Sequence, residues 1–363
     1  MGKKILFLVP YPLHESPSQR FRFEQYFDIL KSKEYSYTIQ SFLDTDNWKV
    51  FYSRGGTIAK LAALISGFGK RIIAVATSPM YDFIFIHREV TPVGPPIFEW
   101  ILAKMFRRKI IYDFDDAIWV TDNQAESFFL RTMKWRSKVS LTCKWAYKVS
   151  CGNEYLYNYA SRFNNQVVLN PTTIDTENLH DRHFYNDFGL GPGARVRIGW
   201  TGSHSTLKYL EQISGILKQI SDNFPEIEFV VIADKEPLLS GVSNVKFVRW
   251  NQVSEIRDLL NFDIGIMPLP DDQWSKGKCG FKALQYMALE IPTIASPVGV
   301  NPKIVDHGVN GFLCHTAEEW IEALSKLIKN PDLRKRMGTN GRKKVIENYS
   351  VLSNTNTFLS LFE

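Results

Sequence analysis

SKGKCGFKALQYMALEIPTIASPVG, residues 275–299, combines a glycine-spaced basic loop, a helical pattern that begins near Phe281 and an apolar strand. Lys278 and Lys282 are four residues apart at the start of the helix. They repel one another and interact unfavourably with the helix dipole, which together destabilise the helix by about half a kcal/mol. An anionic ligand bound by the amides of residues 279–281 explains this placement. The alternative is a surface helix whose lysines extend into solvent, although the apolar strand that follows indicates close packing on a sheet.

Short apolar runs alternate with helical patterns on both sides of this stretch, which is typical of parallel sheets covered by helices. The first set of predicted strands is 5–9, 83–87, 109–114, 148–151 and 166–169. The second set is 197–200, 228–233, 245–248, 264–267, 293–295 and 311–314. We therefore predict an α/β protein with two Rossmann-like parallel-sheet domains.

The domain boundary is predicted at residues 183–196, where three glycines and a proline interrupt the pattern. This gives an N-terminal domain at 1–185, a C-terminal domain at 195–345 and a helix at 346–363 that returns to the first domain. A chain of 363 residues is long enough for two hydrophobic cores. Ligands of two facing α/β domains are expected in a central cleft, at the carboxyl ends of the strands.

Composition narrows the class of protein. A hydrophobic content of 44% and a charged content of 23% are typical of a soluble globular protein. The four cysteines lack metal-ligand spacing, which predicts reduced thiols in a cytoplasmic protein. The apolar run at residues 5–9 is shorter than the core of a signal peptide, and no run reaches the length of a membrane span.

The net charge of +6 is unevenly distributed, because residues 48–80 and 128–152 contain no Asp or Glu. Such basic regions suit an anionic bilayer, a polyphosphate ligand or nucleic acid. Residues 95–109, PPIFEWILAKMFRRK, form a basic amphipathic pattern that could lie in a membrane interface or cover the sheet. Nucleic acid is disfavoured because no recognition motif accompanies the charge.

TGSHSTLKYL follows the predicted strand 197–200 and forms a second candidate phosphate site. Gly202 allows close backbone approach, Ser203 can cap the helix and Lys208 lies in its first turns. A helix N-terminus after a flexible glycine binds anions, but a simple capped helix has the same local sequence.

Polar side chains also follow the strands of the first half. Asp113 and Asp115 form a D-x-D that resembles a metal site, but this pattern is common by chance. Asp115 or Asp116 could accept a hydrogen bond from an acceptor hydroxyl, and a helix cap or an ion pair is the alternative. Glu154 at a strand-to-helix turn is either an acceptor ligand or a helix-dipole partner.

The first strand is followed by HESPSQRFR, in which Arg20 and Arg22 could contact a donor phosphate or an acceptor pyrophosphate. His87 also follows a strand and could line the cleft, although a lone histidine there is more often structural.

Residues 282–345, beginning KALQYMALE, together with RFRFEQYF at 20–27 and VVLNPTTID at 167–175, resemble the retaining GT-B glycosyltransferases of glycosyltransferase family 4 (group 1). The resemblance implies a UDP- or GDP-linked sugar donor on the C-terminal domain, an acceptor on the N-terminal domain, and no metal or other cofactor. It places Lys282 and Gln285 beside the donor diphosphate and ribose, Gly202 at the phosphate loop, and Trp250 near the base.

Two departures from the family pattern concern charge. Members commonly carry two glutamates, at the positions of Gly277 and Gln285, and often an arginine at the position of Ser203. Gln285 can still accept a hydrogen bond from a ribose hydroxyl, but it brings no charge. Neutralisation of the diphosphate would then depend on Lys208, Lys278 and Lys282.

These observations lead to one main hypothesis. The chain is a cytoplasmic, peripheral-membrane enzyme of the hexosyl-transferring class that moves a sugar to a saccharide or lipid-linked acceptor with retention of configuration, in surface polysaccharide or glycolipid biosynthesis. The alternative is a non-catalytic nucleotide-sugar-binding or scaffold protein with a GT-B fold. A sugar-nucleotide epimerase fits the basic N-terminal face less well.

Overall fold

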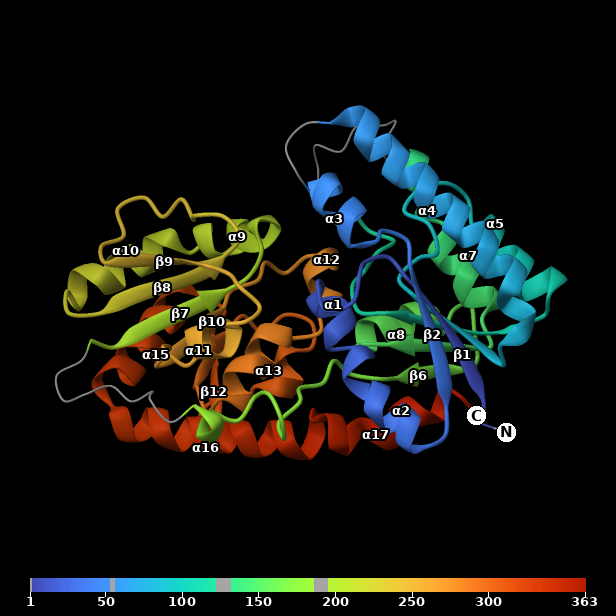
Figure 1. Cartoon of the computed structure of the whole chain (residues 1–363). Helices are drawn as coiled ribbons and strands as arrows, with labels where there is room; N and C mark the ends of the chain where they lie inside the picture. Colours follow the sequence, from blue (N-terminus) through green and yellow to red (C-terminus); the bar gives the residue numbers. More distant parts are fainter. Residues whose placement is uncertain (1, 53–55, 122–131, 186–194) are drawn as a thin grey trace. The chain divides into compact units, whose positions relative to one another are not determined.

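The computed structural model describes residues 2–52, 56–121, 132–185 and 195–363, which form two compact units, each built on its own sheet (Figure 1). Unit 1 comprises Met1–Thr172, Lys276–Cys279 and Asn354–Glu363. Unit 2 comprises Thr173–Ser275 and Gly280–Ser353. Most of the linker predicted at 183–196 lies outside the described residues.

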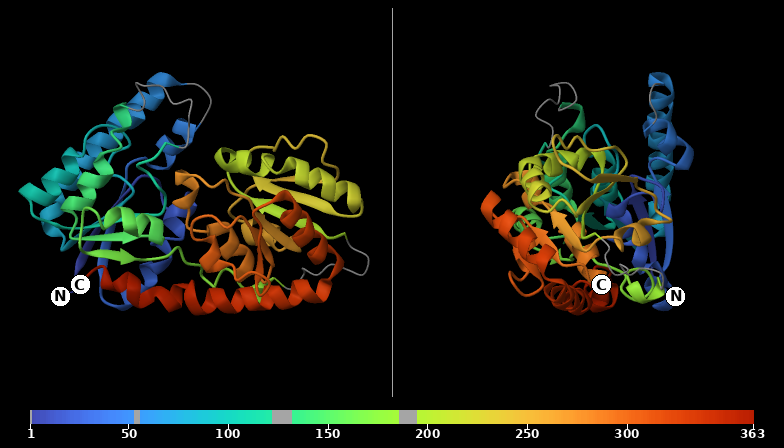
Figure 2. Two further views of the ribbon diagram at one scale, coloured as in Figure 1. Left: turned by 180° about the vertical axis from the view of Figure 1, so that it is seen from behind. Right: turned by 90° about the vertical axis from the view of Figure 1, so that its left-hand side faces the viewer.

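Unit 1 contains a six-stranded sheet in the order β2-β1-β3-β4-β5-β6, and all neighbouring strands are parallel. The strands are β1 (Lys4–Val9), β2 (Ser36–Ser41), β3 (Phe83–His87), β4 (Lys109–Phe114), β5 (Lys148–Cys151) and β6 (Val167–Leu169). The central strands are almost continuously buried because helices cover both faces of the sheet (Figure 2). The strand order reverses between β1 and β3, so this point is the topological switch point.

The helices of unit 1 include the long α4, which spans Thr57–Thr77. The others are α1 (Pro17–Arg20), α2 (Phe27–Ser32), α3 (Thr45–Tyr52), α5 (Ile97–Trp100), α7 (Lys138–Trp145) and α8 (Glu154–Ala160). Short 3₁₀ turns lie at Glu24–Tyr26 and Ser78–Met80, and a π-helical turn at Ile101–Met105 continues α5. The last helix, α17 (Val351–Ser360), brings Phe358 into a stack on Tyr26 with the ring centroids 4.2 Å apart.

Unit 2 contains a second six-stranded parallel sheet in the order β12-β11-β10-β7-β8-β9. The strands are β7 (Arg197–Thr201), β8 (Glu228–Ala233), β9 (Val245–Arg249), β10 (Ile264–Met267), β11 (Thr293–Ala295) and β12 (Gly311–Leu313). Numbered from β7, this is the 3-2-1-4-5-6 order of dinucleotide-binding sheets. The switch point lies between β7 and β10.

Helices of unit 2 follow every strand of the sheet except β8, which leads to β9 without one. They are α9 (His204–Glu211), α10 (Ser214–Asn223), α11 (Glu255–Leu259), α12 (Gln273–Lys276), α13 (Phe281–Ala288), α14 (Asn301–Ile304), α15 (Ala317–Lys329) and α16 (Pro331–Asn348), with a 3₁₀ turn at Arg182–Phe184. A cap fixes the start of α15, where Thr316 Oγ1 accepts a 3.3 Å hydrogen bond from the Glu319 amide. Helix α16 packs closely on α13, because a side chain at Gly341 would meet Met287.

The predicted α/β fold with two parallel sheets is confirmed. The predicted strands match the observed ones within a residue at each end, but β2 was not predicted. Among the described residues, no helix is both long enough and apolar enough to span a membrane.

Candidate functional site

The switch point of unit 2 is a candidate binding site, because two helices begin at the carboxyl ends of the two strands that meet there. Helix α9 follows β7 directly, and α13 follows β10 after the short helix α12. Strands β7 and β10 are hydrogen-bonded neighbours. Ligands of such sheets bind outside the strand ends at this position.

The turn between β7 and α9 requires glycine at position 202. A Cβ atom there would lie 2.4 Å from Cη2 of the Trp200 ring and 2.7 Å from Oγ1 of Thr206. The same Oγ1 accepts a 3.2 Å hydrogen bond from the Ser203 amide, and Ser203 Oγ lies 2.8 Å from Ser205 Oγ. The backbone therefore passes directly over the indole ring at the predicted phosphate loop.

The N-terminus of α9 already holds a carboxylate. Asp234, which follows β8, accepts a 2.5 Å hydrogen bond from the His204 amide and lies 2.6 Å from Nδ1 of the same histidine. Lys208 is half-buried with its Nζ 5.2 Å from the centroid of the Tyr209 ring. An internal carboxylate thus occupies the position that the sequence assigned to a ligand anion, which leaves the start of α13 as the better anion site.

The N-terminus of α13 meets the end of β7. Gly280 caps the helix with φ +70°, and a Cβ atom there would lie 2.1 Å from Cδ1 of Ile304, so only glycine fits. Lys282, in the first turn, is half-buried with its Nζ 5.5 Å from the centroid of the Trp200 ring. Helix amides and an ammonium group therefore lie together at the switch point, which is the chemistry that binds phosphate groups.

Gln285 lies in a different setting from the one predicted. Its side chain is buried, and its Nε2 donates to Oε1 of Glu255 at 3.3 Å and lies 3.3 Å from Nε2 of His180. A ribose hydroxyl does not reach a side chain so placed unless this contact opens. Sequence reasoning missed Glu255 and His180, because each is far from Gln285 along the chain and neither belongs to a motif.

Two other predicted donor contacts, Trp250 and Phe281, are half-buried in unit 2. Trp250, just after β9, is half-buried against a hydrophobic cluster that includes Ile232, Ile256 and Tyr286. The Tyr286 hydroxyl accepts a 3.0 Å hydrogen bond from the Thr201 amide, and burial raises the pKa of this phenol above its usual range. The helix Lys282–Met287 is thus tied to the end of β7.

A buried ionic cluster lies at the carboxyl ends of β3, β4 and β5 in unit 1. The Asp113 carboxylate accepts from the Arg22 guanidinium, from Ser150 Oγ at 2.6 Å and from His87 Nδ1 at 2.8 Å. Arg22 also donates to the Asn170 carbonyl. All five side chains are buried. Burial opposes ionisation of Asp113, but the charge of Arg22 and the contact with His87 outweigh it and lower its pKa below the usual range.

The position of Arg22 and His87 in this buried cluster contradicts their predicted role as open phosphate or acceptor contacts. Arg22 does not lie at an open phosphate site, because its guanidinium is buried and committed to Asp113 and Asn170. His87 does not line an open surface either, because it is fully buried. Its Nε2 has no hydrogen-bond partner within the described part of the chain. Arg20 is half-buried, with its guanidinium 5.0 Å from the centroid of the Phe21 ring.

The predicted catalytic carboxylates Asp115 and Asp116 are ion-paired with one arginine. Arg88 Nε donates to Asp115 Oδ1 at 2.8 Å, and Nη2 donates to Asp116 Oδ2 at 2.6 Å. Arg88 has a positive φ of 61°, which is strained for a residue with a side chain. The ion-pair alternative therefore describes these two carboxylates, and sequence reasoning missed Arg88. Glu154 is exposed in the first turn of α8.

The loop of residues 276–279 belongs to unit 1, where Asn153 holds it. The Asn153 Nδ2 donates to the carbonyls of Lys276, Gly277 and Lys278 at 3.2, 2.9 and 3.0 Å, while its Oδ1 accepts from the Leu156 amide as the cap of α8. Lys278 is half-buried. This anchor fixes the backbone of the loop within unit 1.

Cys279 and Gly277 pack too tightly to contact a ligand through a side chain. Cys279 is buried, its Sγ donates to the Asp115 carbonyl at 3.2 Å, and burial raises the pKa of its thiol. A Cβ atom at Gly277 would lie 2.6 Å from the Cβ and the amide nitrogen of Ala117. The glutamate of the family pattern therefore does not fit here without a shift of the Ala117 backbone. In the described residues, no three His, Cys, Asp or Glu side chains are grouped as metal ligands.

Residues 202–344 match the family described as Glycosyl transferases group 1. An uncharacterized glycosyltransferase of Methanocaldococcus jannaschii is 26% identical over 201 residues, which is 54% of each chain. The human alpha-1,3/1,6-mannosyltransferase ALG2 is 38% identical over 72 residues, 20% of this chain and 17% of the relative. The chain thus matches about half or less of the length of these relatives.

Solved structures share the fold of the whole chain. Sucrose-phosphate synthase from Thermosynechococcus elongatus has a TM-score of 0.69 at 14% identity, covering 100% of this chain and 98% of that one. Anabaena HepE in complex with UDP and glucose has a TM-score of 0.65 at 14% identity, covering 99% and 98%. The two parallel sheets therefore form the GT-B fold that the sequence predicted.

Proposed function

We propose that this protein is a glycosyltransferase that moves a sugar from a nucleotide-sugar donor to a saccharide or lipid-linked acceptor. The observation that carries the proposal is the anion site at the switch point of unit 2, formed by the first turn of α13, Lys282 and Trp200. The residues of this site lie within 202–344, the stretch that matches the group 1 glycosyl transferases, except Trp200, which lies just before it.

The donor diphosphate is proposed to bind at the start of α13. The amides of the first helical turn have no acceptor within the helix, and Lys282 adds a positive charge beside them. Because these groups stabilise the charge that develops on the leaving diphosphate, they could supply this role without a metal. The ligand of HepE supports UDP as the first nucleotide to test, with GDP as the second.

Retention of configuration and an acceptor in surface polysaccharide or glycolipid biosynthesis remain parts of the proposal. In the proposed reaction the acceptor hydroxyl attacks the anomeric carbon from the face that the diphosphate leaves, and the leaving phosphate accepts the hydroxyl proton. No free carboxylate is required for this step, which agrees with the engagement of Asp115 and Asp116 by Arg88.

A non-catalytic nucleotide-sugar-binding protein is the second candidate. The packing of Gly277 on Ala117 favours it, because the first glutamate of the family pattern has no space here. The burial of Gln285 against Glu255 and His180 favours it too, because the second family glutamate is replaced by an uncharged side chain. Turnover of the donor separates this candidate from the enzyme.

A thermal-shift screen of the full chain against UDP, GDP and ADP tests the donor site. A nucleotide that binds the native state raises the Tm, by an amount that grows with its concentration relative to Kd. We expect one of the three to raise the Tm, and the corresponding sugar nucleotide to do the same. If none of them raises it, the proposed donor site is wrong. Retention is tested separately, by determining the anomeric configuration of the reaction product by NMR.

A further inference from the structure

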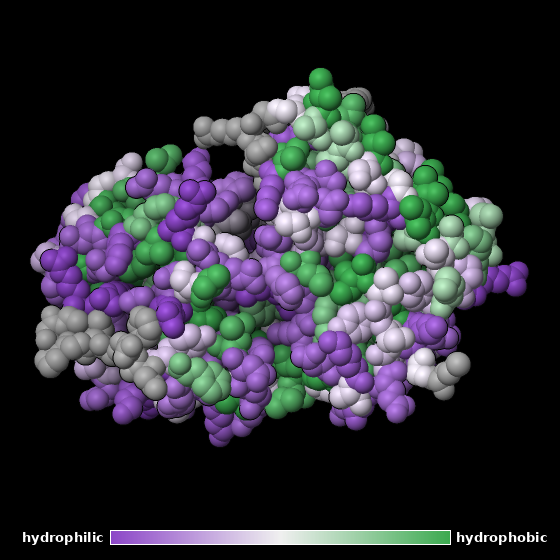
Figure 3. Space-filling view, in the orientation of Figure 1, coloured by the Kyte–Doolittle hydropathy of each residue, from purple (hydrophilic) through white to green (hydrophobic). Residues whose placement is uncertain are grey.

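Helix α4 of unit 1 presents a row of large apolar side chains to solvent. Ile58, Leu61, Ile65, Ile72 and Ile73 are between 57% and 86% exposed, and we call these five residues the apolar ridge. The first four recur at intervals of three, four and seven residues, so they lie along one side of the helix. Figure 3 shows hydrophobic residues along α4 in the upper right of the view.

The apolar ridge is not the side by which α4 packs on its own unit. That side consists of buried residues, among them Ala63, Gly67 and Ala74, and Gly67 lies so close to Phe42 that a Cβ atom would be 2.6 Å from its ring. Helix α4 therefore has two apolar sides, one covered by the protein and one uncovered. Isolated apolar residues on a surface are ordinary, but five on one helix indicate a contact surface.

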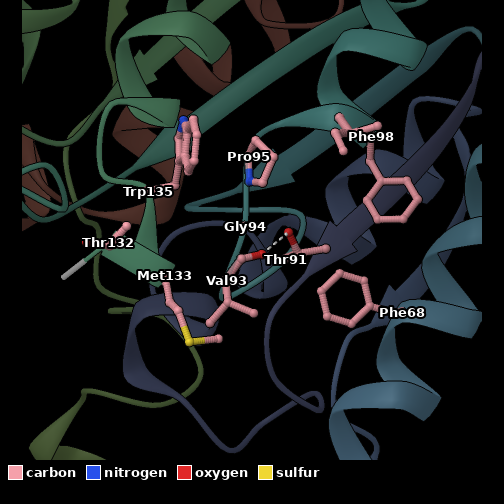
Figure 4. A pocket seen from close by; sticks show the side chains of 10 residues that line it. Phe68, Thr91, Val93, Gly94, Pro95, Phe98, Thr132, Met133 and Trp135 are labelled. Carbon is pink, nitrogen blue, oxygen red and sulfur yellow. Dashed lines mark hydrogen bonds between the residues drawn. The ribbon is translucent and has the colours of Figure 1, made fainter. Parts of the chain in front are cut away.

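A pocket of about 520 Å³ lies between α4, α5 and residues 132–135. Figure 4 shows Phe68 of α4, Phe98 of α5 and Trp135 around it, with Met133 and Pro95 between them. The rings of Phe68 and Phe98 have their centroids 6.3 Å apart. Ile97, Met133 and Trp135 in the lining are themselves more than one third exposed, so the pocket continues an exposed apolar surface beside α4.

The exposed charges within these three segments are of one sign. Lys104, Arg107 and Lys134 are exposed, whereas residues 57–81, 90–112 and 132–152 contain a single carboxylate, Glu99, which is buried. Within these segments the exposed cations have no exposed carboxylate among them, although Asp44 pairs with Lys70 of α4 at 2.5 Å. An apolar surface with this excess of cations complements a negatively charged bilayer. A soluble acidic partner protein would match the charges but not so large an apolar ridge.

We propose that the apolar ridge and the pocket beside it dock on the surface of an anionic lipid bilayer. The ridge enters the boundary between headgroups and acyl chains, the pocket receives an acyl chain of the same bilayer, and the exposed cations face the headgroups. The inference does not depend on the donor site in unit 2.

The test is sedimentation of the full chain with phosphatidylcholine vesicles and with vesicles that also contain phosphatidylglycerol. We expect binding to the anionic vesicles that weakens as salt is added, because the cations are screened. Leu61→Glu is expected to reduce the partition coefficient about tenfold or more, since it removes an apolar side chain that enters the bilayer in the proposed complex and adds a negative charge.

Leu352→Glu is the matched control, because Leu352 is 61% exposed on α17 and Leu61 is 57% exposed on α4. It should bind the vesicles like the wild type. Ile65→Ser is a second variant for the ridge, should Leu61→Glu lower the Tm. Equal binding by the wild type and both ridge variants, or no binding of the wild type to anionic vesicles, overturns the proposal. A wild-type dimer that Leu61→Glu converts to a monomer also overturns it, because a second copy would then cover the ridge.

Discussion

Replacing Lys282 with methionine tests whether its ammonium group contributes to the proposed diphosphate site. Lys282 is in the first turn of α13, and its Nζ lies 5.5 Å from the centroid of the Trp200 ring. Methionine keeps most of the apolar stem and removes only the charge, so the packing around Trp200 is retained. In the absence of ligand, we expect a loss of about 0.5–1 kcal/mol in the free energy of unfolding, the size of one exposed cation–π contact.

The expected effect on ligand binding is larger. A hydrogen bond to a charged group contributes about 1.5–3 kcal/mol, and its loss weakens Kd by roughly ten- to a hundredfold. The loss should occur with the nucleoside diphosphate and should be absent with the parent nucleoside, which has no phosphate for Lys282 to contact. The comparison of the two ligands separates a phosphate contact from a general disturbance of the site.

Isothermal titration calorimetry of both ligands provides the measurement. Lys326→Met is the matched control, because Lys326 lies on α15 of the same unit and pairs with Glu322 at 2.6 Å on the surface. This control should bind both ligands like the wild type. The reasoning is refuted if Lys282→Met binds the diphosphate with unchanged Kd, or if it loses equal affinity for the nucleoside.

Three further predictions concern unit 1. Asp113→Asn leaves the buried Arg22 guanidinium without its counter-charge, so we expect a loss of about 3–5 kcal/mol in the free energy of unfolding by urea. The pKa of Asp113 is lowered in the folded state, so the stability that its ionised carboxylate contributes is present above the unfolded-state pKa of about 4 and is lost as the pH falls below it. Urea midpoints measured from pH 5 downward should therefore fall more steeply in the wild type than in Asp113→Asn. Gly277→Ala is expected to lower the free energy of unfolding by about 1–3 kcal/mol, because the added Cβ would collide with Ala117. Gly69→Ala on α4 should raise it by about 0.5–1 kcal/mol, because the added Cβ would meet no atom within 4 Å. Equal Tm values for the two glycine variants would contradict this packing.

The strands could be predicted from the sequence because most of them are buried on both faces. Strands β3, β4 and β8 each contain an apolar run of three or more residues, and their predicted bounds coincide with the observed ones. Strand β2 was missed because its sequence, SYTIQS, contains no continuous apolar run, and Ser36 and Thr38 are exposed.

The glycines and the lysine at the switch point of unit 2 were also within reach of the sequence. Gly202 and Gly280 follow predicted strands, and the structure shows that both positions exclude a side chain. The position of Lys282 over Trp200 was not predictable, because it depends on the pairing of β7 with β10, which are more than sixty residues apart in sequence.

The partners of the charged residues could not be predicted, because they are distant in sequence. Arg22 and Asp113 are 91 residues apart and were assigned to different roles before the structure paired them. Asp115 and Asp116 were considered for catalysis, but an arginine 27 and 28 residues earlier holds both. A sequence pattern shows which residues follow a strand, but it does not show which opposite charge folds against them.

The central claim is transfer of a sugar from a nucleotide-sugar donor. The full chain should be incubated with UDP- and GDP-linked sugars, with and without a panel of lipid-linked saccharide acceptors, and the released nucleoside diphosphate and the glycosylated acceptor should be measured together. The account predicts that one donor releases its diphosphate in equal amount to the glycosylated product, and only when an acceptor is present. Binding of a donor with no release on any acceptor in the panel would contradict it and would favour the non-catalytic binding protein.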